Sequence, residues 1–290
     1  MKRDFDLHIH TDASDGSYSP RDLVRLAKSE GLKTIAITDH DTVSGVREAI
    51  ITGEELGVTV IPGVEISIDF NPGTMHVCGY NIDIDSRELN DSLKFVQKAR
   101  RERNPKIIEK LNEMGIDITY DDVQNAAGSD QVGRPHFAKV LIQKNYVKDA
   151  QEAFDKYLAK GSSAYVDKER LPLDDAIKII DIAGGVAVLA HPIQLQLGSW
   201  QKYREMISDL KNHGIKGLEA FSSRHTDDES GHFYKIAKDL DMIITCGSDF
   251  HGETKPNVHL GEYGEEVPLA IDEIIESIQL KRKNLKFKIC

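Results

Sequence analysis

The sequence predicts a mixed α/β fold, a distorted TIM-like barrel of the (β/α)7 type with a helical insertion that forms a cap. Short apolar segments with strand character alternate with amphipathic helical segments for most of the chain, which is typical of parallel α/β folds. Metal-type side chains lie within or just after several of these strands, as in barrels whose sites are built at strand ends. With 290 residues and 40% hydrophobic content, the chain can bury a full core.

Seven strands are expected where apolar, β-branched runs end at polar or glycine-containing segments. They cover residues 5–10, 33–38, 58–67, 74–80, 186–190, 217–221 and 242–246. Barrel helices are expected at residues 20–30, 43–56, 173–183, 200–213 and 229–240. The first of them has Ser19 as its N-cap and Pro20 as its first helical residue, and Gly31 ends it.

The alternation of strands and helices stops after residue 80. A long charged helical pattern covers residues 85–114, and shorter ones follow at 120–127, 135–144 and 150–158. We therefore expect residues 88–171 to be a helical insertion that caps the site, between barrel parts formed by residues 1–87 and 172–290. The insertion contains no Gly/Ser-rich linker, so we expect it to pack firmly rather than to swing.

Two strand ends carry paired ligand-type residues. His8 and His10, like Asp249 and His251, are spaced i and i+2, and such side chains point to the same side of a strand. The other candidate metal ligands are Asp15, His40, Glu65, His76 and His191. A single histidine at a strand end is usually structural, but nine ligand-type residues at successive strand ends indicate a metal centre. Imidazole and carboxylate without thiolate suit manganese, iron or zinc.

These residues lie in motifs that resemble, in the same order, those of the polymerase and histidinol phosphatase (PHP) family. The motifs are His8-x-His10, Asp12 to Gly16, Thr38-Asp39-His40, Gly63-Val64-Glu65, Ala190-His191-Pro192 and Ser248-Asp249-x-His251. Within the family, the chain most resembles the stand-alone branch that hydrolyses nucleoside 3',5'-bisphosphates or the 5' end of short RNA. That similarity rests on Asp15, on Gly133-Arg134-Pro135-His136 and on the insertion that carries this segment.

The resemblance implies two to three divalent ions, with manganese expected first and iron or zinc as alternatives. The first ion would take His8, His10, Glu65 and Asp249; the second Glu65, His76 and His191; the third Asp15, His40 and His251. The carboxylate of Glu65 would bridge the first two. A hydroxide that bridges the same two ions would attack phosphorus, and the third ion would help to neutralise the departing oxygen. The implied reaction is hydrolysis of a nucleotide phosphate ester.

Phosphate recognition requires fixed positive charge, and Arg134 is the leading candidate because a guanidinium binds two phosphate oxygens at once. His225, which follows the strand at residues 217–221, is expected to bind phosphate or to protonate the leaving group. Ser223 in the same loop is a further candidate for substrate binding. Arg224 and Lys168 are interpreted more simply as solvated side chains.

Charge and composition limit the partners and the location. The net charge of −11 argues against a long nucleic acid and favours a small anion or the end of a short oligonucleotide. No stretch is long and apolar enough to span a membrane, and no obligate protein partner is indicated. Residues 1–3 lead directly into a strand without an apolar signal segment, and three cysteines are too few for a disulfide framework. We therefore expect a cytoplasmic protein.

Other functions stay open at this point. Histidinol-phosphate phosphatase belongs to the same family, although the long cap and the segment around Arg134 favour a nucleotide substrate. A non-catalytic, metal-stabilised module is opposed by the complete set of ligand residues. Other metallohydrolase chemistry, such as amide hydrolysis, also stays open because a fold does not determine a reaction.

Overall fold

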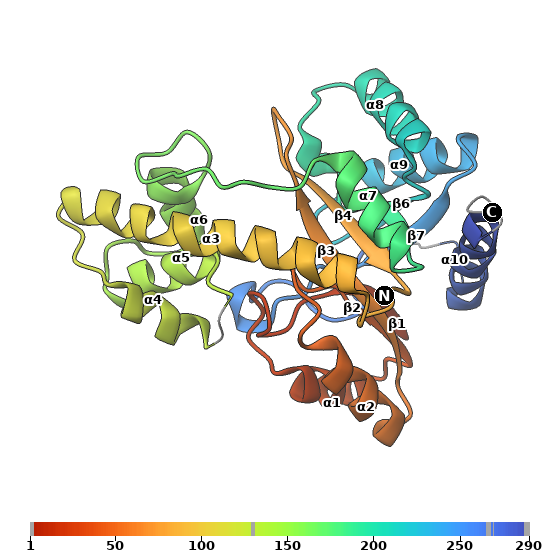
Figure 1. The fold of residues 1–290 in the computed structure, drawn as a ribbon, viewed down its shortest axis with the longest axis horizontal. Helices are drawn as coiled ribbons and strands as arrows, with labels where there is room; N and C mark the ends of the chain where they lie inside the picture. Colours follow the sequence, from red (N-terminus) through yellow and green to blue (C-terminus); the bar gives the residue numbers. More distant parts are fainter. Residues whose placement is uncertain (1–2, 129–130, 265–267, 269, 287–290) are drawn as a thin grey trace.

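The computed structural model describes residues 3–128, 131–264, 268 and 270–286, and side chains up to residue 280. Its seven strands form one sheet in sequence order at the centre of the molecule (Figure 1). The strands are β1 (Phe5–Ile9), β2 (Thr34–Ile37), β3 (Thr59–Ile68), β4 (Met75–Tyr80), β5 (Val186–Leu189), β6 (Gly217–Ser222) and β7 (Ile243–Gly247). A bridge from Ile9 to Phe250 connects the two edges, so the sheet is a nearly closed barrel. The predicted α/β barrel is confirmed.

One strand departs from the expected parallel arrangement. Strand β4 is antiparallel to β3 and β5, whereas the other neighbouring strands are parallel. The connection formed by residues 69–74 is short enough for a hairpin, while a parallel crossover requires a dozen or more residues. His76 therefore lies near the amino end of β4, which is at the same barrel end as the carboxyl end of β3.

Helices surround the barrel and bury their apolar faces against it (Figure 1). They are α1 (Pro20–Ser29), α2 (Val46–Leu56), α7 (Leu173–Ile182), α8 (Trp200–His213), α9 (Asp227–Asp239) and α10 (Ile271–Lys286), with short turns η2 (Pro192–Leu195) and η3 (Gly252–Thr254). As expected, the Ser19 side chain caps α1 by accepting a hydrogen bond from the Asp22 amide. Helix α10 has no counterpart among the expected helices, and it packs through Ile274 and Ile278. None of the described helices is long and apolar enough to cross a membrane.

The remaining helices lie together beside the barrel, on the left in Figure 1. They are α3 (Arg87–Glu113), α4 (Tyr120–Ala127), α5 (Arg134–Gln143), α6 (Ala150–Ala153) and η1 (Phe154–Leu158). This region has its own hydrophobic cluster, which runs from Ile107 to Ala164. The first part of α3, through Val96, packs into the barrel core instead. The long helix α3 thus connects the two hydrophobic cores. The separate cluster supports the proposal that these helices form an insertion. The core of that insertion begins at Ile107, later in the chain than the expected start of the insertion at residue 88.

Candidate metal centre

The structure brings all nine candidate ligands together at one end of the barrel. They fall into four overlapping groups, and within each group the ligand atoms lie within 4.8 Å of one another. The groups are His10, Asp15, His40 and His251; His8, Glu65 and His191; His8, His10 and Asp249; and His40, Glu65 and His76. The strand ends and the loops after them therefore meet as the spacing of these residues predicts.

Glu65 lies at the centre of the group and separates its histidines into two sets. Its Oε1 atom is 2.8 Å from His76 Nδ1 and 2.8 Å from His191 Nε2. Its Oε2 atom is 2.9 Å from His40 Nδ1, 3.2 Å from His10 Nε2 and 3.3 Å from His8 Nε2. Burial opposes ionisation, but the neighbouring histidines outweigh it and hold the pKa of Glu65 well below its usual range. A buried carboxylate whose two oxygens face different sets of imidazoles can bridge two cations.

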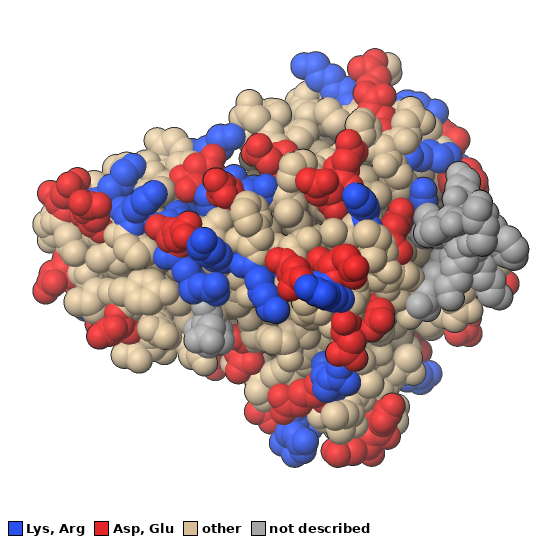
Figure 2. Space-filling model, viewed as in Figure 1, with Lys and Arg blue, Asp and Glu red and all other residues tan. Residues whose placement is uncertain are grey.

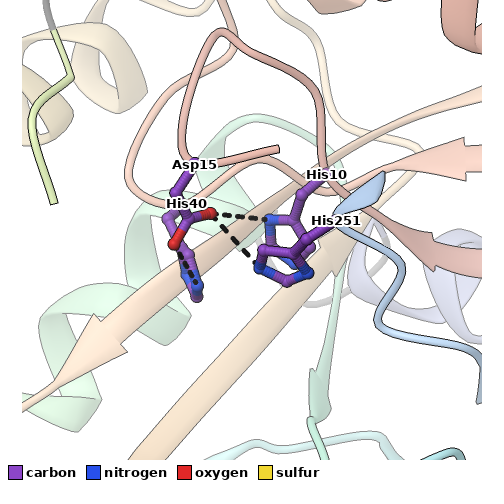
Figure 3. Close-up of side chains that lie close together, drawn as sticks. All are labelled: His10, Asp15, His40 and His251. Carbon is purple, nitrogen blue, oxygen red and sulfur yellow. Dashed lines mark ion pairs between the residues drawn. The ribbon is translucent and has the colours of Figure 1, made fainter. Parts of the chain in front are cut away.

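Asp15 contacts three imidazoles, two of which also face Glu65, as Figure 3 shows for the Asp15 contacts. Its Oδ1 atom is 3.2 Å from His251 Nε2 and 3.9 Å from His10 Nδ1, and its Oδ2 atom is 3.9 Å from His40 Nε2. Burial favours the neutral acid, yet His40 and His251 lower the pKa of Asp15 well below its usual range. Asp15 is therefore an anionic candidate ligand at the edge of the centre.

The loop that carries Asp15 is fixed by a second carboxylate. Asp39 accepts hydrogen bonds from the Thr11 amide and hydroxyl at 2.7 Å each, and from the Ser14 hydroxyl at 2.6 Å. Because Ser14 directly precedes Asp15, these bonds determine where the ligand lies. The acid in the Thr38-Asp39-His40 segment thus holds the loop that carries Asp15, while the neighbouring His40 is a candidate ligand.

Asp249 connects the metal centre to two cations. Its Oδ1 atom is 3.3 Å from His10 Nε2, while its Oδ2 atom accepts from Arg224 Nε at 2.5 Å and Lys255 Nζ at 2.9 Å. Asp249 has a positive φ of 55°, a conformation that a residue other than glycine adopts only when its surroundings hold it there. The two ion pairs are part of those surroundings. Sequence reasoning missed Lys255, which lies in a loop after the final motif.

The donor atoms of this site fit metal ions. Several of them are buried and lack a hydrogen-bond partner among the described residues: His8 Nε2, both ring nitrogens of His10, His40 Nδ1, Glu65 Oε2, His76 Nδ1 and His251 Nε2. Leaving one buried polar atom unsatisfied costs about 1–3 kcal/mol, so a bound ligand is expected to satisfy them. None of the four groups includes a cysteine sulfur, so the donors that the described residues supply are nitrogen and oxygen.

Glu219 on β6 is a functional residue that sequence reasoning missed. Its Oε1 atom lies 2.8 Å from His8 Nδ1, and its Oε2 atom accepts a hydrogen bond from the His191 amide at 2.6 Å. The first contact assigns the proton of His8 to Nδ1 and leaves Nε2 free as a ligand. The signal was present in the sequence, because Glu219 is the one charged residue in the apolar strand predicted at residues 217–221.

We expect Glu219→Gln to weaken metal binding by about 10- to 100-fold, the range typical of partners that orient metal ligands. The amide retains the shape of the side chain but loses the charge that increases the basicity of His8. Metal titration of the stripped protein measures the effect, with circular dichroism to check folding. Glu205→Gln, at an exposed position on α8, is the matched control. Equal affinities of the Glu219 variant and the control would contradict the prediction.

The cap brings the segment around Arg134 close to the metal centre. A methyl group built on Gly133 would lie 3.3 Å from Arg100 Nη1 and 4.0 Å from Asp15 Cβ. Arg134 itself donates from Nη1 to the Leu158 carbonyl at 3.0 Å. This location, beside a candidate ligand yet outside the ligand groups, is compatible with the predicted role of Arg134 in phosphate binding.

The loop after β6 is arranged differently from the expectation. Ser223 lines a cavity of about 510 Å³ together with Arg224, Asp249 and Lys255. His225 instead donates from Nδ1 to the Ala220 carbonyl at 3.1 Å, and its ring packs 4.9 Å from that of Phe233. Burial lowers the pKa of His225 to about 4, so its imidazole is neutral at pH 7. The structure does not bring His225 to the nine ligands, because the turn directs Arg224 toward them.

The nearly closed barrel and its imidazole- and carboxylate-rich end place the chain among metal-binding α/β barrels. Residues 6–223 match the PHP domain, and the chain belongs to this family, as its motifs indicated. It is 36% identical over 252 residues to a 5'-3' exoribonuclease of Haemophilus influenzae, covering 87% of this chain and 91% of that protein. It is 32% identical over 264 residues to a 3',5'-nucleoside bisphosphate phosphatase of Chromobacterium violaceum, covering 91% and 92% of the two chains.

A solved structure shows the same architecture. An amidohydrolase from Chromobacterium violaceum, determined with bound sulfate and without metal, is similar to this chain with a TM-score of 0.87. The two sequences are 30% identical, and the similarity covers 95% of this chain and 97% of that one. The shared fold therefore includes both the barrel and the helices α3 to η1 beside it.

Proposed function

We propose that this protein is a metal-dependent phosphoesterase that removes phosphate from nucleotides. Its substrate is a nucleoside 3',5'-bisphosphate or the phosphorylated 5' end of a short RNA. The observation that carries the proposal is Glu65, whose Oε1 faces His76 and His191 while its Oε2 faces three other histidines, with Asp15 beside them. The exoribonuclease and phosphatase relatives, which match most of the chain, support the same reaction class.

Two to three ions fit this donor set, with the ligands of each as the family resemblance implies. Manganese is the first choice, and iron and zinc suit the same nitrogen and oxygen donors. Divalent ions bound here would lower the pKa of a water molecule and offset negative charge on a phosphoryl group. Other residues of the protein orient the candidate ligands and supply positive charge. Glu219 orients His8, Asp39 positions the Asp15 loop, and Arg224 and Lys255 present cations beside Asp249.

The charges around the site favour a nucleotide over histidinol phosphate. Histidinol phosphate carries an ammonium group, whereas the cap presents Arg100 beside Gly133 and Arg134 immediately after it. That ammonium group would be repelled there. A long nucleic acid is also disfavoured, because Figure 2 shows basic and acidic side chains interspersed over the visible face rather than a broad basic surface.

Kinetics with manganese-loaded protein test the proposed function. We expect phosphate release from a nucleoside 3',5'-bisphosphate or a 5'-phosphorylated short RNA with a higher kcat/KM than from histidinol phosphate. Hydrolysis of an amide substrate serves as the comparison for other metallohydrolase chemistry. A preference for histidinol phosphate, or no phosphatase activity with the metal centre loaded, would overturn the proposal.

Arg134→Ala is expected to lower kcat/KM on a nucleoside bisphosphate by about 10- to 150-fold, the effect of losing one charge-assisted pair. Metal content should not change, because Arg134 is outside the ligand groups. Lysine at this position should restore only part of the activity, since an ammonium cannot form the planar fork. Lys139→Ala, at an exposed position of the same helix, is the control. Wild-type kinetics of Arg134→Ala would show that this arginine does not contact phosphate.

A further inference from the structure

Asp41, which directly follows the candidate ligand His40, lies where the chain after β2 turns away from β3. Just before this point, the Glu65 amide donates to the Asp39 carbonyl at 3.1 Å, and the Asp41 amide donates to the Glu65 carbonyl at 2.8 Å. A regular parallel ladder would continue with a bond from the Ser67 amide to the Asp41 carbonyl. Instead, the Ser67 amide donates to the side chain of Asp41, to Oδ1 at 2.9 Å.

The backbone conformation of Asp41 accounts for this exchange of acceptors. Its φ of 54° lies in the left-handed region, which aspartate and asparagine adopt more readily than most other residues. In this conformation the carboxylate replaces the main-chain carbonyl as the acceptor for β3, and Oδ2 also accepts from the Ser67 hydroxyl at 3.0 Å. The carbonyl of Asp41 is thereby left for donors from another part of the molecule.

Those donors come from the cap. Gln97 on α3 donates from Nε2 to the Asp41 carbonyl at 2.9 Å, and Gln131, just before α5, does so at 3.4 Å. Asp41 Oδ2 accepts from Arg100 Nη2 at 2.5 Å and from Lys168 Nζ at 3.1 Å. One barrel residue therefore receives four cap side chains, which come from α3, from the start of α5 and from the segment that returns to the barrel.

The two ion pairs of Asp41 are buried. The Asp41 side chain is 0% exposed, and those of Lys168 and Arg100 are 6% and 10% exposed, so the expectation of a solvated Lys168 is wrong. Burial favours the neutral acid, but Lys168 and Arg100 outweigh it and hold the pKa of Asp41 well below its usual range. Removing one partner of such a pair leaves an uncompensated charge in the interior, so the contact between cap and barrel depends strongly on this carboxylate.

The turn at Asp41 also determines where His40 lies. His40 Nδ1 is 2.9 Å from Glu65 Oε2, and its Nε2 is 3.9 Å from Asp15 Oδ2. His40 thus belongs to two of the four candidate ligand groups. Because His40 and Asp41 are neighbours in the chain, relaxation of the left-handed turn would move the His40 ring relative to both carboxylates.

We propose that Asp41 is a positioning residue that docks the cap on the barrel and, through this contact, holds His40 in place for metal binding. Docking of the cap and occupation of the ion position at His40 are then coupled. Such coupling is reciprocal, so each event favours the other by the same factor. The inference rests on the metal centre of the proposed function, and it specifies how the cap acts on that centre.

Asp41→Asn separates the ion pairs from the rest of the turn. Asparagine tolerates a positive φ and its side-chain oxygen can accept from the Ser67 amide, but it offers no charge to Arg100 and Lys168. We expect hydrogen exchange of the α4 and α5 amides to become about 100-fold faster or more, as for a broken buried ion pair. Asp91→Asn, which breaks an exposed pair with Lys94 on α3, is the matched control and should exchange like wild type.

Manganese titration of the stripped protein measures the effect on His40. Affinity at one ion position should fall by about 10- to 100-fold in Asp41→Asn and in Lys168→Met, the range for partners that orient metal ligands. Lys98→Met, at an exposed position of α3, is the control for the lysine. In the double variant the two losses should not add, because both substitutions break the same contact. Additive losses would show that Asp41 and Lys168 act independently, contrary to the inference.

The reciprocal effect supplies a readout that does not depend on catalysis. Adding manganese to the stripped wild type and to Asp91→Asn should slow exchange of the α4 and α5 amides by about 10-fold or more, the same factor as in the titration. Exchange in Asp41→Asn should not respond to manganese. If Asp41→Asn does not fold, Lys168→Met takes its place with the same expected outcomes.

The results distinguish this inference from the proposed function. An equal response of Asp41→Asn and wild type to manganese, or no response of the wild type, would overturn the coupling through Asp41. A loaded enzyme without activity on any phosphate ester would instead overturn the proposed function, while exchange and titration would still decide whether Asp41 couples the cap to His40.

Discussion

Glu65→Gln is expected to remove more bound metal than Asp15→Asn. The two oxygens of Glu65 face different sets of histidines, so the amide removes one negative charge shared by two ion positions. It also places an N–H donor against imidazole nitrogens that must bind metal. We expect Glu65→Gln to lower the metal affinity of at least two ion positions. Its loss of activity should exceed the roughly 10- to 100-fold loss that is typical of residues that only orient ligands.

Asp15→Asn is the informative comparison for this prediction. Asp15 contacts His251 and His40 at the edge of the centre, so its loss should affect one ion position and leave those around Glu65 occupied. Elemental analysis of both variants, at matched folding by circular dichroism, measures the difference. Equal metal losses, or a larger loss in Asp15→Asn, would show that Glu65 does not bridge.

Removing the metal ions is expected to abolish phosphoesterase activity and to lower the thermal stability of the protein. A ligand present at 100 times its dissociation constant stabilises the folded state by about 2.7 kcal/mol. For a chain of this size that corresponds to a decrease in Tm of roughly 5–10 °C after chelation. Differential scanning calorimetry before and after chelation, with manganese added back, provides the test. An unchanged Tm in the stripped protein would contradict tight binding.

The affinity of the protein for metal ions is expected to depend on pH. Burial alone would lower the pKa of His10, but Asp249 and Glu65 outweigh burial and raise it to about 9. His10 must lose its proton to bind metal, so affinity should increase with pH up to about 9 and binding should release protons. In the metal-free protein, protonated His10 contributes stability below its unfolded pKa of about 6.5, and this contribution disappears as the pH rises through 9. Metal titrations at several pH values would show the trend, and pH-independent affinity would contradict it.

Local patterns in the sequence were sufficient for the barrel strands and for the grouping of the ligands. Strand β1 ends within one residue of the predicted position, and the i and i+2 spacing of His8 and His10 directs both side chains inward. These features depend on alternation within a single strand and on the rule that strand ends meet at one edge of a barrel. Periodicity and neighbouring residues contain that information, so it can be read without knowledge of distant contacts.

Contacts between distant segments were decided only by the tertiary structure. The sequence placed a strand at residues 74–80, but its antiparallel direction depends on how a short connection packs against β3 and β5. The pairing of Glu219 with His8 joins residues 211 positions apart. The turn after β6 directs Arg224 toward Asp249 and His225 toward the Ala220 carbonyl.

The sequence by itself thus determined the fold class and the common location of the candidate ligand residues, because each follows from local spacing. The tertiary structure decided which carboxylate contacts which candidate ligand, and it brought Arg100 and Lys168 to Asp41. These arrangements depend on contacts between segments far apart in the chain, and such contacts leave no periodic trace in a single sequence.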